Sequence, residues 1–283
     1  MDTILKNLTK DEHAQYAEEV TDVTDKIKLL CSSRQIAIIS SGGTKVKLDA
    51  KGEYMIDNFA SGWRGVYLTE NLIDQGFFVI FLYRKTSHVP YERSYSHVNE
   101  ETVNMYNERL QKIKNNRENL VCLSFDFIFE YLYKLWQLSE NIQKLNCSQK
   151  VMYIMAAAVS DFYVPLEDLP DDLEDRVESI TMKLKTTPKI LGLIKKLFPK
   201  PNFIMVSFKL ETDETILEDK VIKSFNSNFS DYIVGNVLST RNKRLYLYHM
   251  VEGKHEVIVI EKEVEGQGIL EAKLVKLLVD LIK

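Results

Sequence analysis

Residues 35–44 read QIAIISSGGT, a short apolar run that ends in a pair of glycines. A continuous run rich in β-branched residues is typical of a strand buried on both faces, and the glycines after it predict a turn. Further apolar runs follow at residues 77–83 (FFVIFLY), 120–125 and 151–159 (VMYIMAAAV), with helical patterns between them. This order predicts an α/β fold with a Rossmann-like, mostly parallel sheet flanked by helices.

The C-terminal half continues the alternation and then departs from it. Strands are predicted at residues 203–208 and 232–234, with a helical pattern between them. Apolar runs at residues 245–248 and 257–260 flank a Glu-Gly-Lys turn, which predicts a small antiparallel hairpin. A final helix is expected from about residue 269.

The remaining segments suggest a single domain. Thr9 and Glu12 form a capping-box pattern before a helical repeat, which predicts a leading helix. Residues 85–118 are rich in charge and asparagine and interrupt the alternation. We therefore expect one α/β domain over residues 1–283, with residues 1–34 as an N-terminal helical extension and residues 85–118 as a polar insertion.

Composition disfavours several classes of protein. The 283 residues are 45% hydrophobic with a formal net charge of -4, so no global basic field attracts a nucleic-acid backbone. The N-terminus lacks the apolar core of a signal peptide, and no stretch reaches the roughly 18 apolar residues of a membrane span. We expect a cytoplasmic protein that binds neither nucleic acid nor membrane. Cys31, Cys122 and Cys147 are scattered, which predicts neither a disulfide framework nor a zinc site.

Loops that leave the carboxyl ends of parallel strands line one crevice. The segments predicted to meet there are residues 40–44, 58–65, 157–161, 208–211 and 235–236. Glycines in the first two let backbone amides approach a phosphate, and a helix N-terminus favours anions. Such glycines also serve turns and close packing, and their spacing matches neither Walker A nor GxGxxG. The residues alone leave both interpretations open.

Individual residues of this crevice also have two interpretations. Asn58 either caps the following helix, which its spacing favours, or holds a ligand carboxylate. Residues 156–158, three alanines, either pack tightly or free a backbone edge for an extended substrate. Asp161 is an exposed acid, a Mg²⁺ ligand or a hydrogen-bond acceptor. Phe208 is a core side chain or a stacking platform for a base.

Taken together, these motifs resemble those of eukaryotic phosphopantothenate–cysteine ligase. The resemblance covers roughly residue 35 to the C-terminus and is weakest across residues 85–150. The matching stretches, in the family's order, are SGGTKV (41–46), DNFASG (57–62), FLYR (81–84), AAAVSDFYVP (156–165), ITMK with PK (180–183 and 188–189) and SFKLETD (207–213).

The resemblance implies binding residues position by position. Those expected to hold the pantothenate arm are Asn58, Ala157, Ala158 and Asp161. Those expected to hold the nucleotide are Gly42, Gly43, Ala60, Gly62, Gly65, Phe208 and Asn236. Asn58 and Lys183 are the expected catalytic residues, with Lys183 either a cation near the developing pyrophosphate or a surface lysine.

Two positions depart from the family pattern. Ala60 stands where the family usually has Ser, so only a backbone contact is expected there. Tyr54 stands where relatives carry an Arg that reaches across a dimer to the substrate phosphate. A phenol can donate one hydrogen bond but lacks the bidentate grip of a guanidinium. Lys45, Lys47, Lys51 or a residue of the partner chain are alternative sources of charge.

The activity implied is ligation of 4'-phosphopantothenate to L-cysteine through an acyl-nucleotidylate, with ATP as co-substrate, Mg²⁺, and release of pyrophosphate. The choice of ATP over CTP and the metal ligands are left open. A homodimer is also implied, with the hairpin at residues 245–260 or the segment 46–56 as its interface.

Two rival functions share this fold pattern. An NAD(P)-dependent oxidoreductase would use similar glycine turns, but the chain lacks GxGxxG followed by an acidic residue. A non-catalytic nucleotide-binding protein would account for Tyr54 and Ala60.

Overall fold

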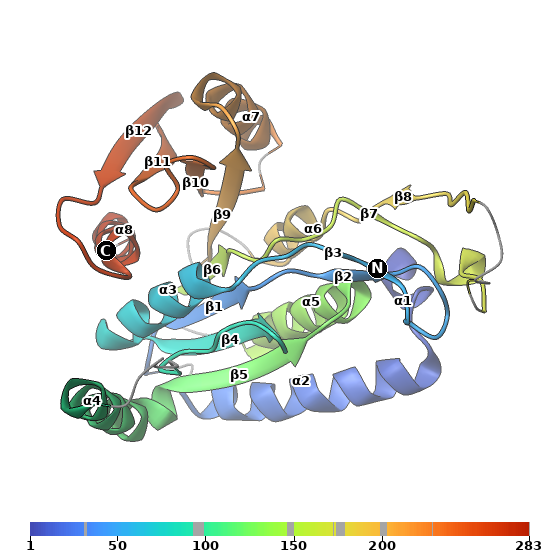
Figure 1. The fold of residues 1–283 in the computed structure, drawn as a ribbon, viewed down its shortest axis with the longest axis horizontal. Coiled ribbons are helices and arrows are strands. Elements are labelled where there is room, and N and C mark those ends of the chain that lie inside the picture. Colours follow the sequence, from blue (N-terminus) through green and yellow to red (C-terminus); the bar gives the residue numbers. More distant parts are fainter. Residues whose placement is uncertain are drawn as a thin grey trace.

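The computed structural model describes residues 1–30, 33–92, 99–145, 150–171, 173, 179–198, 203–227 and 229–282. Its parallel strands are β1 (Ile36–Ser41), β4 (Phe78–Arg84), β5 (Leu120–Phe125), β6 (Val151–Met155), β9 (Phe203–Glu211) and β10 (Tyr232–Val237). The antiparallel pair β11 (Arg244–Val251) and β12 (Lys254–Glu261) continues the sheet beyond β10. Within the described residues these strands form one eight-stranded sheet in the order β12-β11-β10-β9-β6-β1-β4-β5 (Figure 1). The predicted fold class is confirmed.

Helices cover both faces of the sheet. One face packs against α1 (Asp2–Leu5), α2 (Lys10–Leu30), α5 (Ile128–Leu145) and α6 (Ile190–Leu197). The other face packs against α3 (Trp63–Asp74) and α8 (Ile269–Leu281). α7 (Glu214–Asn226) lies against β9 and β10. None of the helices in the described ranges combines the length and apolar character needed to cross a membrane.

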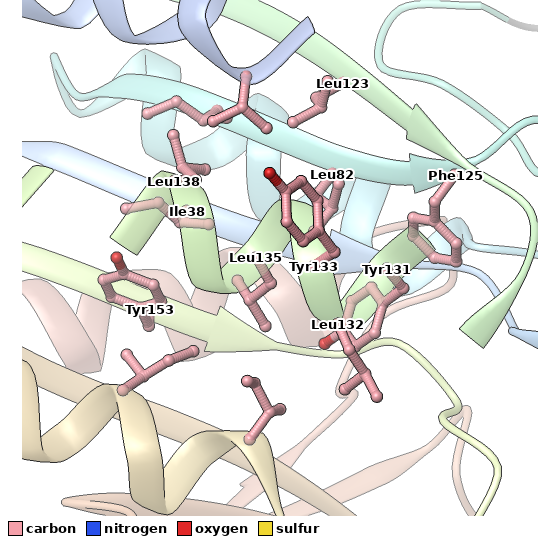
Figure 2. Close-up of a cluster of buried hydrophobic side chains, with 14 of the residues drawn as sticks. Ile38, Leu82, Leu123, Phe125, Tyr131, Leu132, Tyr133, Leu135, Leu138 and Tyr153 are labelled. Carbon is pink, nitrogen blue, oxygen red and sulfur yellow. The ribbon is translucent and has the colours of Figure 1, made fainter. Parts of the chain in front are cut away.

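Helix α5 fills the centre of the first face. Figure 2 shows its side chains Leu135 and Leu138 among strand residues, including Ile38 of β1 and Tyr153 of β6. These side chains are fully buried. Burial of this kind, at roughly 25 cal/mol per Å² of apolar surface, is the main force that holds the helix on the sheet.

Short elements extend from the carboxyl ends of the strands. Two small hairpins, β2 (Lys45–Lys47) with β3 (Met55–Asp57) and β7 (Phe162–Tyr163) with β8 (Lys185–Thr186), follow β1 and β6. Between β4 and β5, α4 (Glu100–Asn116) and the short η1 (Arg117–Asn119) occupy the predicted polar insertion. Another short 3-10 turn, η2 (Leu166–Asp168), follows β7.

The strand ends differ from the sequence prediction. The run at residues 151–159 leaves the sheet after Met155, because Ala158 turns to pair with the glycine turn at Gly43. Conversely, β9 and β10 run further than predicted, so residues 209–211 and Asn236 lie inside strands rather than in the loops after them. Polar residues near the ends of β9 and β10 made the last residues of these strands resemble loops in the sequence.

The structure confirms the predicted capping box at the start of the leading helix. The Thr9 N–H donates to the Glu12 carboxylate at 2.9 Å, and the Glu12 N–H donates to Thr9 Oγ1 at 3.2 Å. Cys122 is exposed on the edge strand β5. Cys31, Cys147 and residues 172 and 174–178 lie outside the described residues.

Candidate functional site

A cavity of about 1120 Å³ opens at the carboxyl ends of the central strands, between the N-terminal ends of α3 and α8. The predicted crevice is therefore present. The sequence-predicted residues on its wall are Gly42, Ala60, Gly62, Gly65, Ala157, Ala158, Asp161, Phe208 and Asn236. Gly43, Asn58 and Lys183 are not on that wall.

The glycines of the site serve different purposes. Gly42 and Gly62 have φ of 85° and 84°, in the left-handed region that side chains disfavour, and Gly62 is the N-cap of α3. A Cβ on Gly65 would overlap Ser41, so this glycine lets α3 approach β1 closely. A Cβ on Gly43 would overlap the carbonyl oxygen of Asn58. Gly43 thus brings the segment that carries Asn58 against the end of β1.

Asn58 is not a helix cap, which corrects the interpretation that its spacing favoured. Helix α3 begins at Trp63, so three residues separate Asn58 from the N-cap Gly62. Its backbone N–H instead donates to the carbonyl oxygen of Thr44 at 3.1 Å. The segment is therefore fixed by backbone contacts with the glycine turn, and the amide side chain is not required for capping.

An ion pair between a buried arginine and an exposed aspartate also anchors this segment. Arg84 at the end of β4 donates two hydrogen bonds to Asp57, with Nη1–Oδ1 at 2.6 Å and Nη2–Oδ2 at 2.7 Å. The Arg84 side chain is only 7% exposed. Hydrogen bonds from Arg84 lower the pKa of Asp57, which keeps the carboxylate charged. Sequence reasoning recognised both residues in matching stretches but assigned them no role.

The three alanines after β6 pack against the glycine turn. The Ala158 N–H donates to the Gly42 carbonyl at 2.8 Å, and the Thr44 N–H donates to the Ala158 carbonyl at 3.0 Å. The Ala157 N–H donates to Ser40 Oγ at 3.2 Å. These contacts favour the tight-packing interpretation for Ala158, while both alanines still face the cavity.

The acidic and basic residues that follow the three alanines in the chain lie on exposed segments. Asp161 Oδ1 is 3.3 Å from Nζ of Lys189, and both side chains are mostly exposed. Lys189 lines the cavity, whereas Lys183 lies outside it on an exposed segment. Lys185 pairs with Glu167 at 3.3 Å. Of the lysines in the matching stretches at residues 180–183 and 188–189, Lys189 and not Lys183 therefore lines the cavity.

Tyr54, which stands where the family has an arginine, lies in the segment that contains the small hairpin of β2 and β3, which we call the β2–β3 arm. Tyr54 precedes β3, its side chain is 45% exposed, and its backbone N–H donates to Asp49 Oδ2 at 3.1 Å. Lys45 pairs with Asp126 at 3.3 Å. Lys47 pairs with Glu12, also at 3.3 Å. Two of the three lysines considered as replacements, Lys45 and Lys47, are thus engaged within the fold.

The opposite end of the cavity is aromatic and basic. Phe208 is partly buried on β9, and Asn236 on the neighbouring β10 is 6% exposed. The basic side chains on this part of the wall are Arg64, Lys209, Arg241 and Lys262, and the acidic one is Glu271. Burial raises the pKa of Glu271. This end suits an anionic ligand with a flat ring.

The donor set of the site is compatible with Mg²⁺ that arrives on a nucleotide. Among the described wall residues the carboxylates are Asp161 and Glu271. The described ranges contain no group of three or more His, Cys, Asp or Glu residues that could hold a metal. Mg²⁺ commonly binds through one or two carboxylates, substrate phosphates and water, which requires no such group.

Comparisons with known proteins agree with this geometry. A family model for the C-terminal domain of the DNA/pantothenate metabolism flavoproteins matches residues 136–273. Phosphopantothenate–cysteine ligase CAB2 of Saccharomyces cerevisiae is 32% identical over 273 residues, covering 83% of this chain and 72% of the yeast protein. Phosphopantothenate–cysteine ligase 1 of Arabidopsis thaliana is 32% identical over 270 residues, covering 87% of this chain and 82% of the plant protein.

A solved structure is similar over nearly the whole chain. It is a Cab2 mutant in complex with phosphopantothenate-cysteine, with a TM-score of 0.82 and 25% identity, and the match covers 99% of this chain and 96% of that one. Because the yeast and plant ligases are 32% identical to this chain over 83% and 87% of its length, the chain belongs to the phosphopantothenate–cysteine ligase family.

Proposed function

We propose that this chain joins 4'-phosphopantothenate to L-cysteine through an amide bond, a step of coenzyme A biosynthesis, and that it activates the carboxylate with ATP. The observation that carries the proposal is the single cavity in which the motifs expected for the pantothenate arm meet those expected for the nucleotide. Membership of the ligase family supports the same activity.

Activation is required because a carboxylate is a poor acylating agent. A carboxylate oxygen of 4'-phosphopantothenate attacks the α-phosphorus of ATP, the bond to the β-phosphate oxygen breaks, and pyrophosphate leaves. The neutral amine of cysteine then attacks the acyl carbon, forms the amide, and displaces AMP with loss of one proton. The protein supplies alignment, charge neutralisation and exclusion of water.

The proposed roles of the binding residues combine the family resemblance with the places of these residues on the cavity wall or, for Asn58 and Gly43, beside it. Asn58 orients the reacting carboxylate from the segment fixed by Gly43 and Arg84, and Ala157, Ala158 and Asp161 hold the pantothenate arm. The residues proposed to contact the nucleotide phosphates are Gly42, Gly43, Ala60, Gly62 and Gly65.

The base and the leaving group would lie further along the cavity. Phe208 and Asn236 contact the base or ribose. Lys183 neutralises the leaving pyrophosphate after its exposed segment moves toward the cavity, whereas Lys189 already lies there. Mg²⁺ would neutralise phosphate charge, held by the nucleotide and at most by Asp161 or Glu271.

Homodimerisation through the β2–β3 arm is part of the proposal. Tyr54, Met55 and Ile56 on this arm and the nearby Phe59 are exposed, with Phe59 at 86%. A partner chain would cover these side chains. We also propose that the reaction takes place in the cytoplasm, where ATP and reduced cysteine are both available.

The test is a reconstituted reaction. Purified protein is incubated with 4'-phosphopantothenate, cysteine, Mg²⁺ and either ATP or CTP, and pyrophosphate, nucleoside monophosphate and the amide are measured. We expect equal amounts of the three products, and none of the amide when cysteine is omitted. Formation of ADP without the other substrates, or no turnover, would refute the proposal. Hydride transfer with NAD(P)H would favour the oxidoreductase instead.

A further inference from the structure

Arg64 crosses the nucleotide end of the cavity. It stands in the first turn of α3, and its Nη2 donates to the carbonyl oxygen of Arg241 at 3.0 Å. Its Nε lies 3.8 Å from a carboxylate oxygen of Glu271 on α8. Its guanidinium carbon is 5.8 Å from the centre of the Phe208 ring. The Arg64 side chain therefore lies against three separate segments of the cavity wall.

The hydrogen-bonding capacity of this guanidinium is not used up. Nη1 of Arg64 is buried and has no hydrogen-bond partner among the described residues. The 3.8 Å separation from Glu271 is also too long for a hydrogen bond. A guanidinium carries five N–H donors, and leaving them buried and unpaired is unfavourable. The side chain, only 20% exposed, is thus held where an acceptor is missing.

The surrounding charges define the acceptor. Arg241 and Lys262 lie on the same part of the wall, and Glu271 is the acidic side chain there among the described residues. Burial raises the pKa of Glu271, and this one acidic side chain faces the three cations Arg64, Arg241 and Lys262. The N-terminal end of α3, with Gly62 and Arg64 in its cap and first turn, adds a positive dipole end. This combination favours a strongly anionic oxygen over a neutral ring atom.

We propose that Arg64 positions the nucleotide by donating from Nη1 to an oxygen of its β- or γ-phosphate, the part that leaves as pyrophosphate. This rests on the proposed function, and it adds a residue that the sequence motifs did not single out. Phe208 keeps the guanidinium plane in place, and Glu271 competes with the phosphate for it. The alternative is that Arg64 only stabilises the packing of α3 against α8.

The first experiment separates phosphate binding from a structural role. Arg64→Gln and Arg64→Lys are compared with the control Arg244→Gln, which removes a guanidinium that pairs with Glu261 away from the cavity. We expect Arg64→Gln to raise the KM for ATP and the Kd for pyrophosphate by about 10- to 100-fold, because a charged hydrogen bond is lost. The KM values for 4'-phosphopantothenate and cysteine and the Kd for adenosine should stay unchanged. Arg64→Lys should restore part of the loss, and Arg244→Gln should match the wild type.

Glu271→Gln supplies an opposite expectation. Removing the competing carboxylate should lower the KM for ATP, even if Arg64→Gln proves too unstable to purify. Equal losses for ATP and adenosine, or unchanged ATP binding in Arg64→Gln and Glu271→Gln, would overturn the inference and leave the ligase function intact. A wild-type protein that binds pyrophosphate but forms no amide would instead refute the proposed function, and the pyrophosphate Kd of the variants would still test Arg64.

Discussion

The contact between Gly43 and the Asn58 carbonyl joins two motifs that lie apart in the sequence. We predict that Gly43→Ala separates them, because the added Cβ would overlap that oxygen and displace Asn58. A shift of about 1 Å in a positioning residue can cost roughly 100-fold in rate, so kcat/KM should fall by at least that order.

Gly253→Ala is the matched control for this substitution. Gly253 has φ of 81° and nothing within 4 Å of an added Cβ, so alanine there introduces backbone strain of about 1–2 kcal/mol without a collision. It should lower stability in urea titrations but leave kcat/KM near the wild-type value. Equal kinetic losses in the two variants would contradict a specific role for Gly43.

For single residues, the sequence predicted which segments converge at the cavity but not what each residue does there. Gly43 was grouped with phosphate-binding glycines, whereas its packing partner Asn58 is 15 positions away in the chain and only the fold brings them together. Asn58 was interpreted as a cap because Asn commonly precedes helices. Arg64 was not singled out, since an arginine beside a glycine turn resembles any surface cation until its neighbours are known.

Helices α2 and α5 meet around a buried charge. Lys134 of α5 is fully buried, and its Nζ donates to Glu19 of α2 at 2.5 Å, to Glu130 at 2.7 Å and to the Ser124 carbonyl at 2.8 Å. Burial raises the pKa of Glu19, but hydrogen bonds from Lys134 and Gln15 bring it below its usual value. The ion pair between Glu19 and Lys134, together with apolar packing, therefore holds α2 against α5.

Removing this lysine should be costly. Lys134→Met leaves Glu130, which is 3% exposed, without its cation, and we expect a loss of about 3–5 kcal/mol in the free energy of unfolding. Urea denaturation measures the change. The double variant Lys134→Met with Glu130→Gln removes the stranded charge and should recover part of the loss. If the double variant is no more stable than the single one, the charge argument fails.

The elements themselves were largely predictable, and their order in the sheet was not. Apolar runs located β1, β4 and β5 to within a residue or so, because strands buried on both faces have no polar alternation to confuse them. The end of β6 was missed because alanine suits both a strand and a close-packed turn. Nothing local in the sequence states that β1 pairs with both β4 and β6, since pairing depends on long-range packing.

We predict that residues 1–283 form one folding unit, because the eight described strands make one continuous sheet. The two tryptophans of the chain test this, because Trp136 packs against the core on the α5 face and Trp63 against the core on the α3 face. We predict that Trp63→Phe and Trp136→Phe, each with one remaining tryptophan that is excited selectively, give urea midpoints by fluorescence that coincide with the midpoint by far-UV circular dichroism. Midpoints that differ between fluorescence and circular dichroism in either variant would indicate two units.

The central place of β1 also has a consequence during synthesis. Ser40 of β1 lies opposite Met155 of β6, a residue 115 positions later. At roughly 5–20 residues per second, a ribosome needs on the order of ten seconds to deliver that partner. Until then the emerging chain carries β1 with β4 on one side and without its other strand neighbour, so one edge of β1 stays unpaired. The nascent polypeptide is accordingly most prone to aggregation before β6 emerges, and its yield should depend on the pace of translation and on chaperones that bind in that interval.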